Sequence, residues 1–395
     1  MSLKLSDRVN AIQPSATIAM NVKAKALAEK GISVINLSVG EPDFDTPTFI
    51  QDAAMLAMRA GQTRYTAADG SPALKQAIAD KLQRDNELHY KTQDILVTSG
   101  AKQALFNAMQ ALLNPEDEVI IPAPYWVSYP DMVLLTGAKP IVVHAGIDQQ
   151  YKISAEQLEA AITPKTRMVI LNSPSNPTGA SYQHDELQTL SKVLMKHPHI
   201  SVLSDDIYEY INFEMTPFVN IVNVCPELRE QTIIVNGVSK SHAMTGWRIG
   251  YAAGPSGAIS AMKKLQSQST SCANSIAQAA AVAALEATRD SFFTPMLKAY
   301  HERHLWLLEA INTIEGFEAI PAQGTFYLFV RVEEAIQQLR LTDDLSFASL
   351  LLEDAHVATV PGTAFGSPGY LRLSFATKLE ALQQAVQRIA QVVKQ

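Results

Sequence analysis

Short apolar runs alternate with longer stretches of helical periodicity over the first 285 residues or so of the chain. Several runs are continuously apolar rather than alternating in polarity, which is typical of strands buried on both faces of a sheet. Segments of helical length, such as 101–113 and 184–197, lie between the runs. This order predicts an α/β fold with a mostly parallel sheet and helices on both faces. The predicted strands span 34–40, 94–100, 118–124, 139–145, 167–174, 200–206, 231–237 and 248–254.

The pattern changes after about residue 285, where a long helical stretch over 290–314 precedes a mixed segment and a closing helix. Such a mixture predicts a smaller α+β domain. We therefore expect a large domain over 46–285 and a small domain formed by 1–45 together with 286–395. The apolar runs of the mixed segment cover 325–332, 357–362 and 370–376.

Composition narrows the class of protein. The chain has 395 residues, of which 47% are hydrophobic and 18% charged, so it can form large cores. The formal net charge is −7, which argues against broad nucleic-acid binding and against an electrostatic membrane anchor. We find neither an apolar signal segment nor a run approaching the roughly 20 residues of a membrane span. Cys225 and Cys272 are too few for a disulfide framework, so we expect a cytoplasmic enzyme in a reducing compartment.

Polar and small residues follow the predicted strands. The carboxyl ends of parallel strands share one edge of a sheet, where such folds bind their ligands. Turns prefer Gly, Asn, Asp and Ser, and this preference alone explains any one of these residues, whereas the whole set is better explained by a single ligand-binding site. The positions are Gly40, Ser99, Gly100, Trp126, residues 172–176, Asp205 and Lys240.

Two segments suggest a phosphate group and a reactive amine. In SGAKQAL (99–105), small residues directly precede a helix, so backbone N–H groups can face an anion. In VNGVSKSHAMTGWRIGY (235–251), a buried Lys240 can form a Schiff base and Arg248 can grip a phosphate. The alternative for this pair is a surface lysine and an arginine in a salt bridge. HERH (301–304) lacks a third ligand, so we expect exposed helical histidines and no metal site.

The segment around Lys240 resembles the lysine motif of the pyridoxal-phosphate-dependent aminotransferases of class I, the aspartate aminotransferase family. The resemblance spans nearly the whole chain, and it is strongest to bacterial members that begin with a PSAT segment, here residues 14–17. It implies a fold-type I transferase, pyridoxal 5′-phosphate as cofactor, and a homodimer with shared active sites. The other matching motifs are GEPDFDTP (40–47), YTAADG (65–70), TSGAKQALF (98–106), PYWVSYP (124–130), NSPSNPTG (172–179), SDDIYEY (204–210) and YLRLSFA (370–376).

The resemblance assigns cofactor roles to matching positions. Lys240 corresponds to the lysine that binds the cofactor and transfers the substrate proton, and Asp205 to the carboxylate that pairs with the pyridine nitrogen. Tyr208 and Asn176 correspond to the partners of the phenolic oxygen, whereas Asp206 is expected outside the site. The remaining cofactor positions are the phosphate-binding Gly100, Ala101, Ser239 and Arg248, the stacking Trp126, and Tyr65, which reaches the phosphate from the second subunit.

The substrate positions follow in the same way. Arg372 corresponds to the arginine that grips the substrate α-carboxylate, with Gly40, Asn176 and Trp126 beside it. Lys102 and Thr17 are the candidates for recognising an acidic side chain. Lys102 alternatively supports only the cofactor phosphate.

The leading hypothesis is transfer of the amino group of L-aspartate to 2-oxoglutarate by a ping-pong mechanism, which forms oxaloacetate and L-glutamate. Two alternatives keep the fold: an aromatic or prephenate aminotransferase, and a pyridoxal-phosphate-dependent C–S lyase. A ligand-sensing regulator with an aminotransferase-like domain is disfavoured. Such regulators carry a basic winged-helix domain first, whereas the motifs here begin within the first 50 residues.

Overall fold

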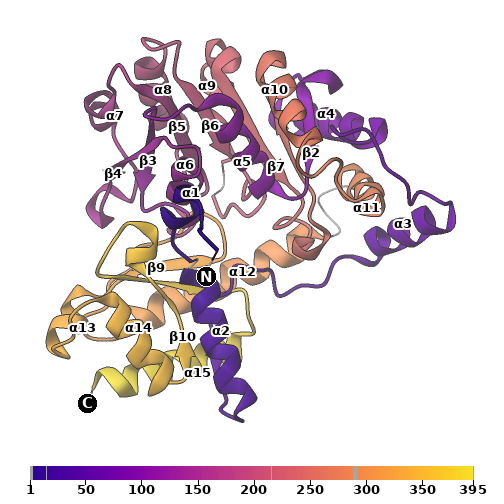
Figure 1. Cartoon of the computed structure of the whole chain (residues 1–395). Helices are drawn as coiled ribbons and strands as arrows, with labels where there is room; N and C mark the ends of the chain where they lie inside the picture. The colour runs from indigo at the N-terminus through magenta and orange to yellow at the C-terminus, as the bar shows by residue number, and fades with distance from the viewer. Residues whose placement is uncertain (1–2, 15, 215, 288–291, 395) are drawn as a thin grey trace.

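The computed structural model describes residues 3–14, 16–214, 216–287 and 292–394, and its largest element is a seven-stranded sheet (Figure 1). The strand order is β2-β8-β7-β6-β5-β3-β4. Only β8 runs antiparallel to its neighbours, which confirms the predicted mostly parallel sheet. The strands are β2 (Ile95–Thr98), β3 (Glu118–Ala123), β4 (Lys139–His144), β5 (Thr166–Asn172), β6 (Ser201–Asp205), β7 (Thr232–Gly237) and β8 (Gly250–Ala253).

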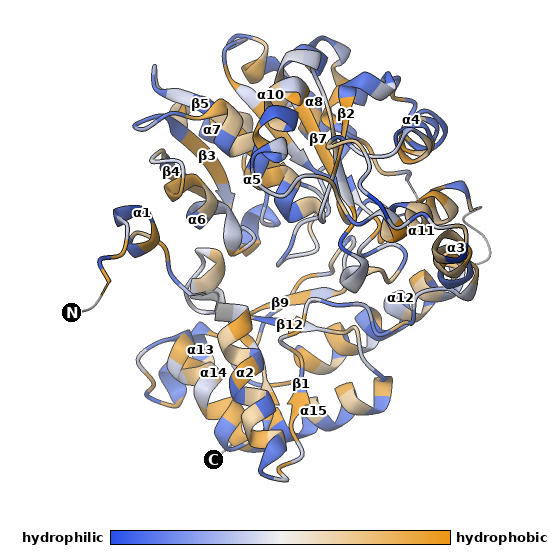
Figure 2. Cartoon of the chain, turned by 45° about the vertical axis from the view of Figure 1, so that its right-hand side comes forward, coloured by the Kyte–Doolittle hydropathy of each residue, from blue (hydrophilic) through white to orange (hydrophobic). Residues whose placement is uncertain are grey.

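Two hydrophobic cores enclose this sheet, one on each face. Ile95 and Val97 of β2 belong to one core and Leu96 to the other, so the continuously apolar sequence of the strand is buried on both sides. Figure 2 shows β2 and β7 as hydrophobic strands, whereas the outer helix α4 carries many hydrophilic positions. One face is covered by α5 (Ala101–Leu112), α6 (Ser128–Leu134) and α10 (Ser256–Ser267), and the other by α4 (Pro72–Asn86), α7 (Ala155–Ala161), α8 (His184–Leu194), α9 (Ile221–Val224) and α11 (Ser275–Glu286).

The N- and C-terminal residues share a third core. An antiparallel sheet in the order β11-β12-β9 lies there beside the parallel pair β1-β10. Of the predicted strand 34–40, only two residues form a strand. They pair with the C-terminal part of the chain and not with the main sheet. The strands are β1 (Ile35–Asn36), β9 (Tyr327–Arg331), β10 (Val357–Ala358), β11 (Val360–Pro361) and β12 (Tyr370–Ser374).

The helices of this region pack around the small sheets (Figure 1). The predicted helix 290–314 is observed as α12, and residues 290 and 291 lie outside the described residues. His304 on this helix is buried and accepts a hydrogen bond from the Ala322 N–H, so the expected exposure is wrong for His304, whereas His301 is exposed as expected. The remaining helices are α1 (Asp7–Asn10), α2 (Ala16–Glu29), α3 (Thr48–Arg59), α12 (Phe293–Ile311), α13 (Glu333–Gln338), α14 (Asp344–Glu353) and α15 (Leu379–Val393).

The topology brings the strand ends to one edge of the main sheet, facing β9 and β12 of the small sheet (Figure 2). Asn172 ends β5 and Asp205 ends β6, and the two residues are paired in register. The division of the chain at residues 45/46 and 285/286 stays a prediction. No helix in the described part of the chain is both long enough and apolar enough to cross a membrane.

Candidate active site

A cavity of about 360 Å³ lies at the carboxyl ends of the strands. Every predicted site residue lines it except Gly100, which lies beside it, and Tyr65. Asn172, one of the strand-end residues 172–176 expected at the site, lines it as well. Sequence analysis missed four lining residues: Leu105, Tyr129, Ile207 and Tyr327. The predicted residues that line it are Thr17, Gly40, Ala101, Lys102, Trp126, Asn176, Asp205, Tyr208, Ser239, Lys240, Arg248 and Arg372.

Lys240 follows β7 and directs its amine into the cavity. The Nζ atom donates a hydrogen bond to the Gly40 carbonyl at 2.7 Å. Burial is the main cause that lowers the pKa of Lys240 to about 8; the charge of Glu41 opposes it, and the cations Arg248 and Arg372 act in the same direction as burial. At pH 7 about one tenth of the molecules therefore carry the free amine, which is the form that acts as a nucleophile or a base.

Asp205, at the end of β6, lines the cavity and is 4% exposed. The Tyr129 hydroxyl donates to its Oδ2 at 2.6 Å, and the Ile207 N–H donates to its Oδ1 at 3.3 Å. Burial raises the pKa of Asp205 to about 6, and these two hydrogen bonds act in the opposite direction. A carboxylate in this setting is suited to hold a protonated ring nitrogen.

Tyr129 was missed although it belongs to the motif PYWVSYP. It lies three residues after Trp126, and the two rings make an edge-to-face contact with centroids 5.3 Å apart. The spacing of three residues in a helical turn was the signal that could have identified it, because such residues share a face.

Tyr208 and Tyr327 form a second polar pair. Their hydroxyl oxygens are 2.9 Å apart, and both side chains are buried. The guanidinium of Arg372 lies 4.2 Å from the centre of the Tyr327 ring. Tyr327 lies on β9 in an apolar run, where an aromatic residue is indistinguishable by pattern from a core residue.

Arg372 is a buried cation, 2% exposed, without an acidic partner among the described residues. Nη1 donates to Asn176 Oδ1 at 2.9 Å and Nη2 donates to the Ser38 carbonyl at 2.7 Å, whereas Nε has no partner. Burying an unpaired guanidinium is costly. The arrangement therefore suits an anionic ligand, and a carboxylate matches the planar fork of arginine.

A second anion cradle lies where Arg248 approaches the N-terminus of α5. Gly100 has φ +84°, and a Cβ there would lie 2.3 Å from Arg248 Nη2. A Cβ at Gly250 would lie 2.2 Å from the Ala101 nitrogen. Glycine is thus required at both positions, because the backbone and the guanidinium approach so closely. The helix N-terminus and the exposed Arg248 together suit a phosphate.

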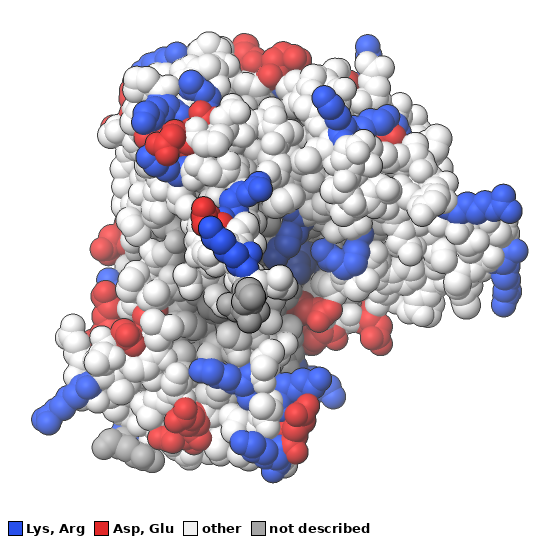
Figure 3. Space-filling model, in the orientation of Figure 1, with Lys and Arg blue, Asp and Glu red and all other residues white. Residues whose placement is uncertain are grey.

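Lys102 lies at the outer side of the cavity. Its Nζ is 4.7 Å from the centre of the Trp126 ring and donates to Ser128 Oγ at 3.2 Å. Burial and the charge of Arg248 lower the pKa of Lys102. Thr17, which is on α2, lines the same cavity, whereas Ser15 of the PSAT segment lies outside the described residues. Figure 3 shows the basic side chains in the hollow at the centre of the molecule.

Tyr65 does not reach the cavity of its own subunit. Its side chain is 92% exposed, on the segment between α3 and α4. The surface of α3 also exposes large apolar side chains, namely Phe49, Met55, Leu56 and Met58.

A mostly parallel sheet with a partly buried lysine, a buried aspartate and two anion cradles at its strand ends defines a fold-type I transferase, as predicted. Residues 32–389 match the profile of the class I and II aminotransferases, and the chain belongs to that family. It is 52% identical to an aspartate/prephenate aminotransferase of Nitrosomonas europaea over 99% of this chain and 100% of that one.

Solved structures agree with this assignment. An aspartate aminotransferase from Rhizobium meliloti superposes with a TM-score of 0.95 at 44% identity, covering 100% of this chain and 99% of that one. An aspartate aminotransferase from Thermus thermophilus, determined with maleate, gives 0.94 at 41% identity over 99% and 100%.

Proposed function

We propose that this aminotransferase uses pyridoxal 5′-phosphate to transfer the amino group of L-aspartate to 2-oxoglutarate. One observation carries the proposal: four cations line a cavity in which Asp205 is the one acidic residue of the described lining. A phosphate, an α-carboxylate and a side-chain carboxylate need three of these cations, here Arg248, Arg372 and Lys102. Lys240 is then left for the chemistry. The names of the relatives and the maleate of the Thermus structure support a dicarboxylic substrate.

The cavity fits the cofactor, as the glycine-dependent cradle at Arg248 and the buried carboxylate of Asp205 indicate. When bound, pyridoxal phosphate supplies an aldehyde that condenses with amines and a ring that accepts electrons from the substrate Cα. Asp205 would hold the ring nitrogen protonated, and Trp126 would stack on the ring. Tyr208 and Asn176 would contact the phenolic oxygen. The phosphate would be held by Gly100, Ala101, Ser239 and Arg248, with Lys102 near them.

The chain's own residues then perform orientation and proton transfer. Arg372, fixed by Asn176 and the Ser38 carbonyl, orients the α-carboxylate. Lys240 Nζ would take up the proton released from the substrate Cα and hold it for delivery to the carbon that carries the aldehyde group of the cofactor. A base with a pKa of about 8 is suited to this step, because its free amine is populated and its conjugate acid still donates. Lys102, with Thr17 beside it, recognises the distal carboxylate.

The active form is expected to be a homodimer in the cytoplasm. Tyr65 is exposed near the apolar surface of α3, which supports a role in which it completes the phosphate site of a second copy. Arg248 is exposed, so the hydroxyl of such a tyrosine could bind the cofactor phosphate beside it. The two cysteines are free, which is consistent with a reducing compartment.

The visible absorbance spectrum tests the proposal. Purified protein with pyridoxal phosphate should show a yellow band that is lost on adding L-aspartate alone and returns with 2-oxoglutarate. The Lys240→Ala variant should lose transamination by at least about 100-fold, the lower end of the range for general acid–base catalysis. A yellow band insensitive to aspartate would refute the acidic substrate, and near-normal activity of Lys240→Ala would refute the assignment of that lysine.

Prephenate is a second candidate substrate, because the Nitrosomonas relative is named for both substrates. The same spectral assay, started from the amine form of the cofactor, shows whether prephenate is accepted in addition to 2-oxoglutarate. Return of the yellow band with prephenate as efficiently as with 2-oxoglutarate would establish a dual specificity.

A further inference from the structure

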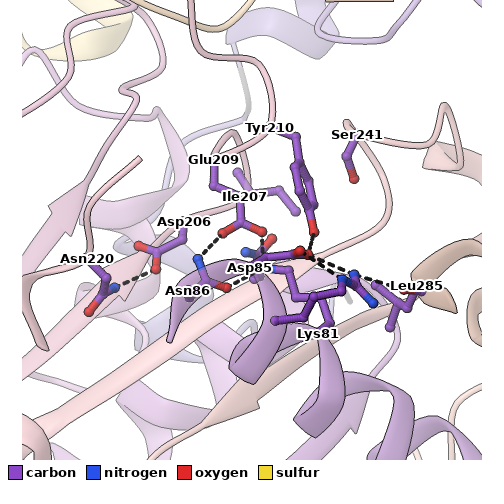
Figure 4. Close-up of polar contacts among 12 residues, drawn as sticks. Lys81, Asp85, Asn86, Asp206, Ile207, Glu209, Tyr210, Asn220, Ser241 and Leu285 are labelled. Carbon is purple, nitrogen blue, oxygen red and sulfur yellow. Dashed lines mark hydrogen bonds and ion pairs between the residues drawn. The ribbon is translucent and has the colours of Figure 1, made fainter. Parts of the chain in front are cut away.

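The segment 205–210 directs its side chains in two opposite directions. Asp205 and Tyr208 line the cavity. Asp206, Glu209 and Tyr210 do not, and they lie in a buried polar cluster against α4 and α9 (Figure 4). The proposed function uses only the first two side chains, so the second set needs its own explanation.

Glu209 makes an ion pair with Lys81 of α4. Lys81 is 0% exposed and Glu209 is 5% exposed. Asn86 completes the pair: its Nδ2 donates to Glu209 Oε2 at 2.8 Å, and its Oδ1 accepts from Lys81 Nζ at 2.7 Å. The three side chains thus form a closed ring of contacts between α4 and the segment that carries Asp205.

Asp206 is held separately, at the other end of the same turn. Ser204 Oγ donates to its Oδ1 at 2.7 Å, and Asn220 Nδ2 donates to its Oδ2 at 2.5 Å. Asn220 also caps α9, so its position is fixed by a helix. Burial, together with the charge of Glu209, raises the pKa of Asp206 to about 7.

The turn between these two anchors forms part of the candidate site. The Glu209 N–H donates to the Asp206 carbonyl at 2.9 Å and closes the turn. Within it, the Ile207 N–H donates to Asp205 Oδ1, and the Tyr208 hydroxyl contacts Tyr327. A rotation of the turn would therefore displace a hydrogen-bond donor of Asp205 and the hydroxyl of Tyr208 together.

We propose that Lys81 is a positioning residue for the active site: its ion pair with Glu209, braced by Asn86, holds the turn 206–209 so that Asp205 and Tyr208 face the cofactor. The inference rests on the proposed function of those two residues. A buried ion pair generally contributes little net stability compared with a well-packed apolar pair, whereas it does define a unique geometry. The Lys81–Glu209 pair joins residues 128 positions apart, and its side chains do not touch the cavity.

The test compares Lys81→Met, Glu209→Gln and the double variant with wild type and a control. Lys75→Met is the matched control, because Lys75 lies on the same helix in a partly buried ion pair with Asp69, away from the turn. Three quantities are measured. The first is the dissociation constant of pyridoxal phosphate for the apoprotein. The second is the pH midpoint of the visible band, meaning the pH at which the absorbance of the yellow form is half converted, and the third is the pair kcat and KM for aspartate.

We expect each single variant to bind pyridoxal phosphate about tenfold more weakly and to lose about 10- to 100-fold in kcat with KM changed less than about threefold, as small displacements of catalytic groups do. The pH midpoint of the band should shift by about half a unit or more, because the partners of Asp205 and Tyr208 move. The double variant leaves no unpaired buried charge, so its thermal stability should exceed that of the single variants. Its cofactor affinity and pH midpoint should stay altered.

Two results would overturn the inference. One is a double variant whose cofactor affinity and pH midpoint equal those of wild type, since the ion pair would then serve stability alone. The other is single variants that match Lys75→Met in all three measurements. If a single variant does not fold, the double variant decides. A wild-type protein that binds no pyridoxal phosphate would instead refute the proposed function, so the two failures are distinguishable.

Discussion

At the scale of single residues, burial sets the chemistry of the site by acting on two groups in opposite directions. It lowers the pKa of Lys240 to about 8 and raises that of Asp205 to about 6. Both shifts have the same cause, since removal from water disfavours the charged form of either group. The lysine becomes available as a base, whereas the aspartate needs hydrogen bonds to remain ionised. Tyr129 supplies one of them.

The Tyr129→Phe variant tests this role. It removes the hydroxyl that donates to Asp205 but keeps the ring that packs on Trp126. The pKa of Asp205 should rise further, so fewer molecules carry its carboxylate at neutral pH. We expect pyridoxal phosphate to bind about tenfold more weakly near pH 6.5, as for loss of a hydrogen bond to a charged group. The difference in affinity between Tyr129→Phe and wild type should vanish above about pH 8, where the Asp205 carboxyl is ionised in both proteins.

A titration of cofactor affinity against pH, with Tyr125→Phe as the control, checks this expectation. The control changes a neighbouring tyrosine that makes no hydrogen bond to Asp205 in the described structure. Affinity curves of Tyr129→Phe and wild type that coincide at every pH would contradict the role.

Lys102 provides a prediction about specificity. The Lys102→Ala variant should raise KM for aspartate about tenfold, the loss expected for one charge-assisted hydrogen bond. KM for phenylalanine should change little, because that substrate has no distal carboxylate. Steady-state kinetics with both amino acids measure the ratio. Equal effects on both substrates would assign Lys102 to the cofactor phosphate instead.

At the scale of elements, the carboxyl end of β6 combines two adjacent aspartates with different surroundings. Asp205 faces the cavity, whereas Asp206 faces the polar cluster under α4 and α9. A strand directs successive side chains to opposite faces, so a single motif can supply one functional and one supporting carboxylate. The proposed positioning by Lys81 and Glu209 acts on this strand end.

The buried Asp206 predicts a specific pH dependence of stability. Its folded-state pKa, about 7, is above the ordinary value of 3.8, so the folded protein binds the extra proton between these values. This contribution to stability is complete below about pH 3.8 and is lost as the pH rises towards 7. Relative to Asp206→Asn, the wild-type free energy of unfolding should fall over this range by at most about 4 kcal/mol, since one pKa unit corresponds to about 1.4 kcal/mol.

Urea unfolding of both apoproteins from pH 4.5 to 8 measures the difference. The difference between the two curves reports Asp206 together with its electrostatic interaction with Asp205. Unfolding free energies that stay parallel across the range would show that Asp206 does not titrate there.

At the scale of the whole molecule, the cavity depends on distant parts of the chain. Arg372 of β12 hydrogen-bonds Asn176, which follows β5, and the Ser38 carbonyl, which follows β1. Arg372 is therefore positioned only when the N-terminal segment, the main sheet and the C-terminal sheet are packed together. In the proposed dimer, a second copy of the chain would add Tyr65 to this assembly.

Mixed dimers test the proposal that two copies of the chain share each site. Tyr65→Ala should bind pyridoxal phosphate weakly, and Lys240→Ala should be inactive. A mixed dimer of the two contains one site with both native residues. Equal amounts, dissociated and reassociated at random, should therefore recover about one quarter of wild-type activity at limiting cofactor, because half of the dimers are mixed and each has one intact site. Activity no higher than the sum of the two separate variants would exclude a shared site.

The sequence by itself determined the layered α/β fold and the polar residues at the strand ends. Through eight ordered motifs, it also identified most of the residues that line the cavity. These features are local, because strand polarity, helix starts and motif residues can be read within a few positions. Tertiary structure alone decided that β8 runs antiparallel, that residues 35 and 36 pair with residues 357 and 358, and that Tyr129 and Tyr327 face the cavity. It also decided that Lys81 meets Glu209. Such pairings depend on the direction each side chain takes and on which segments the packing brings together, and hydrophobic periodicity encodes neither.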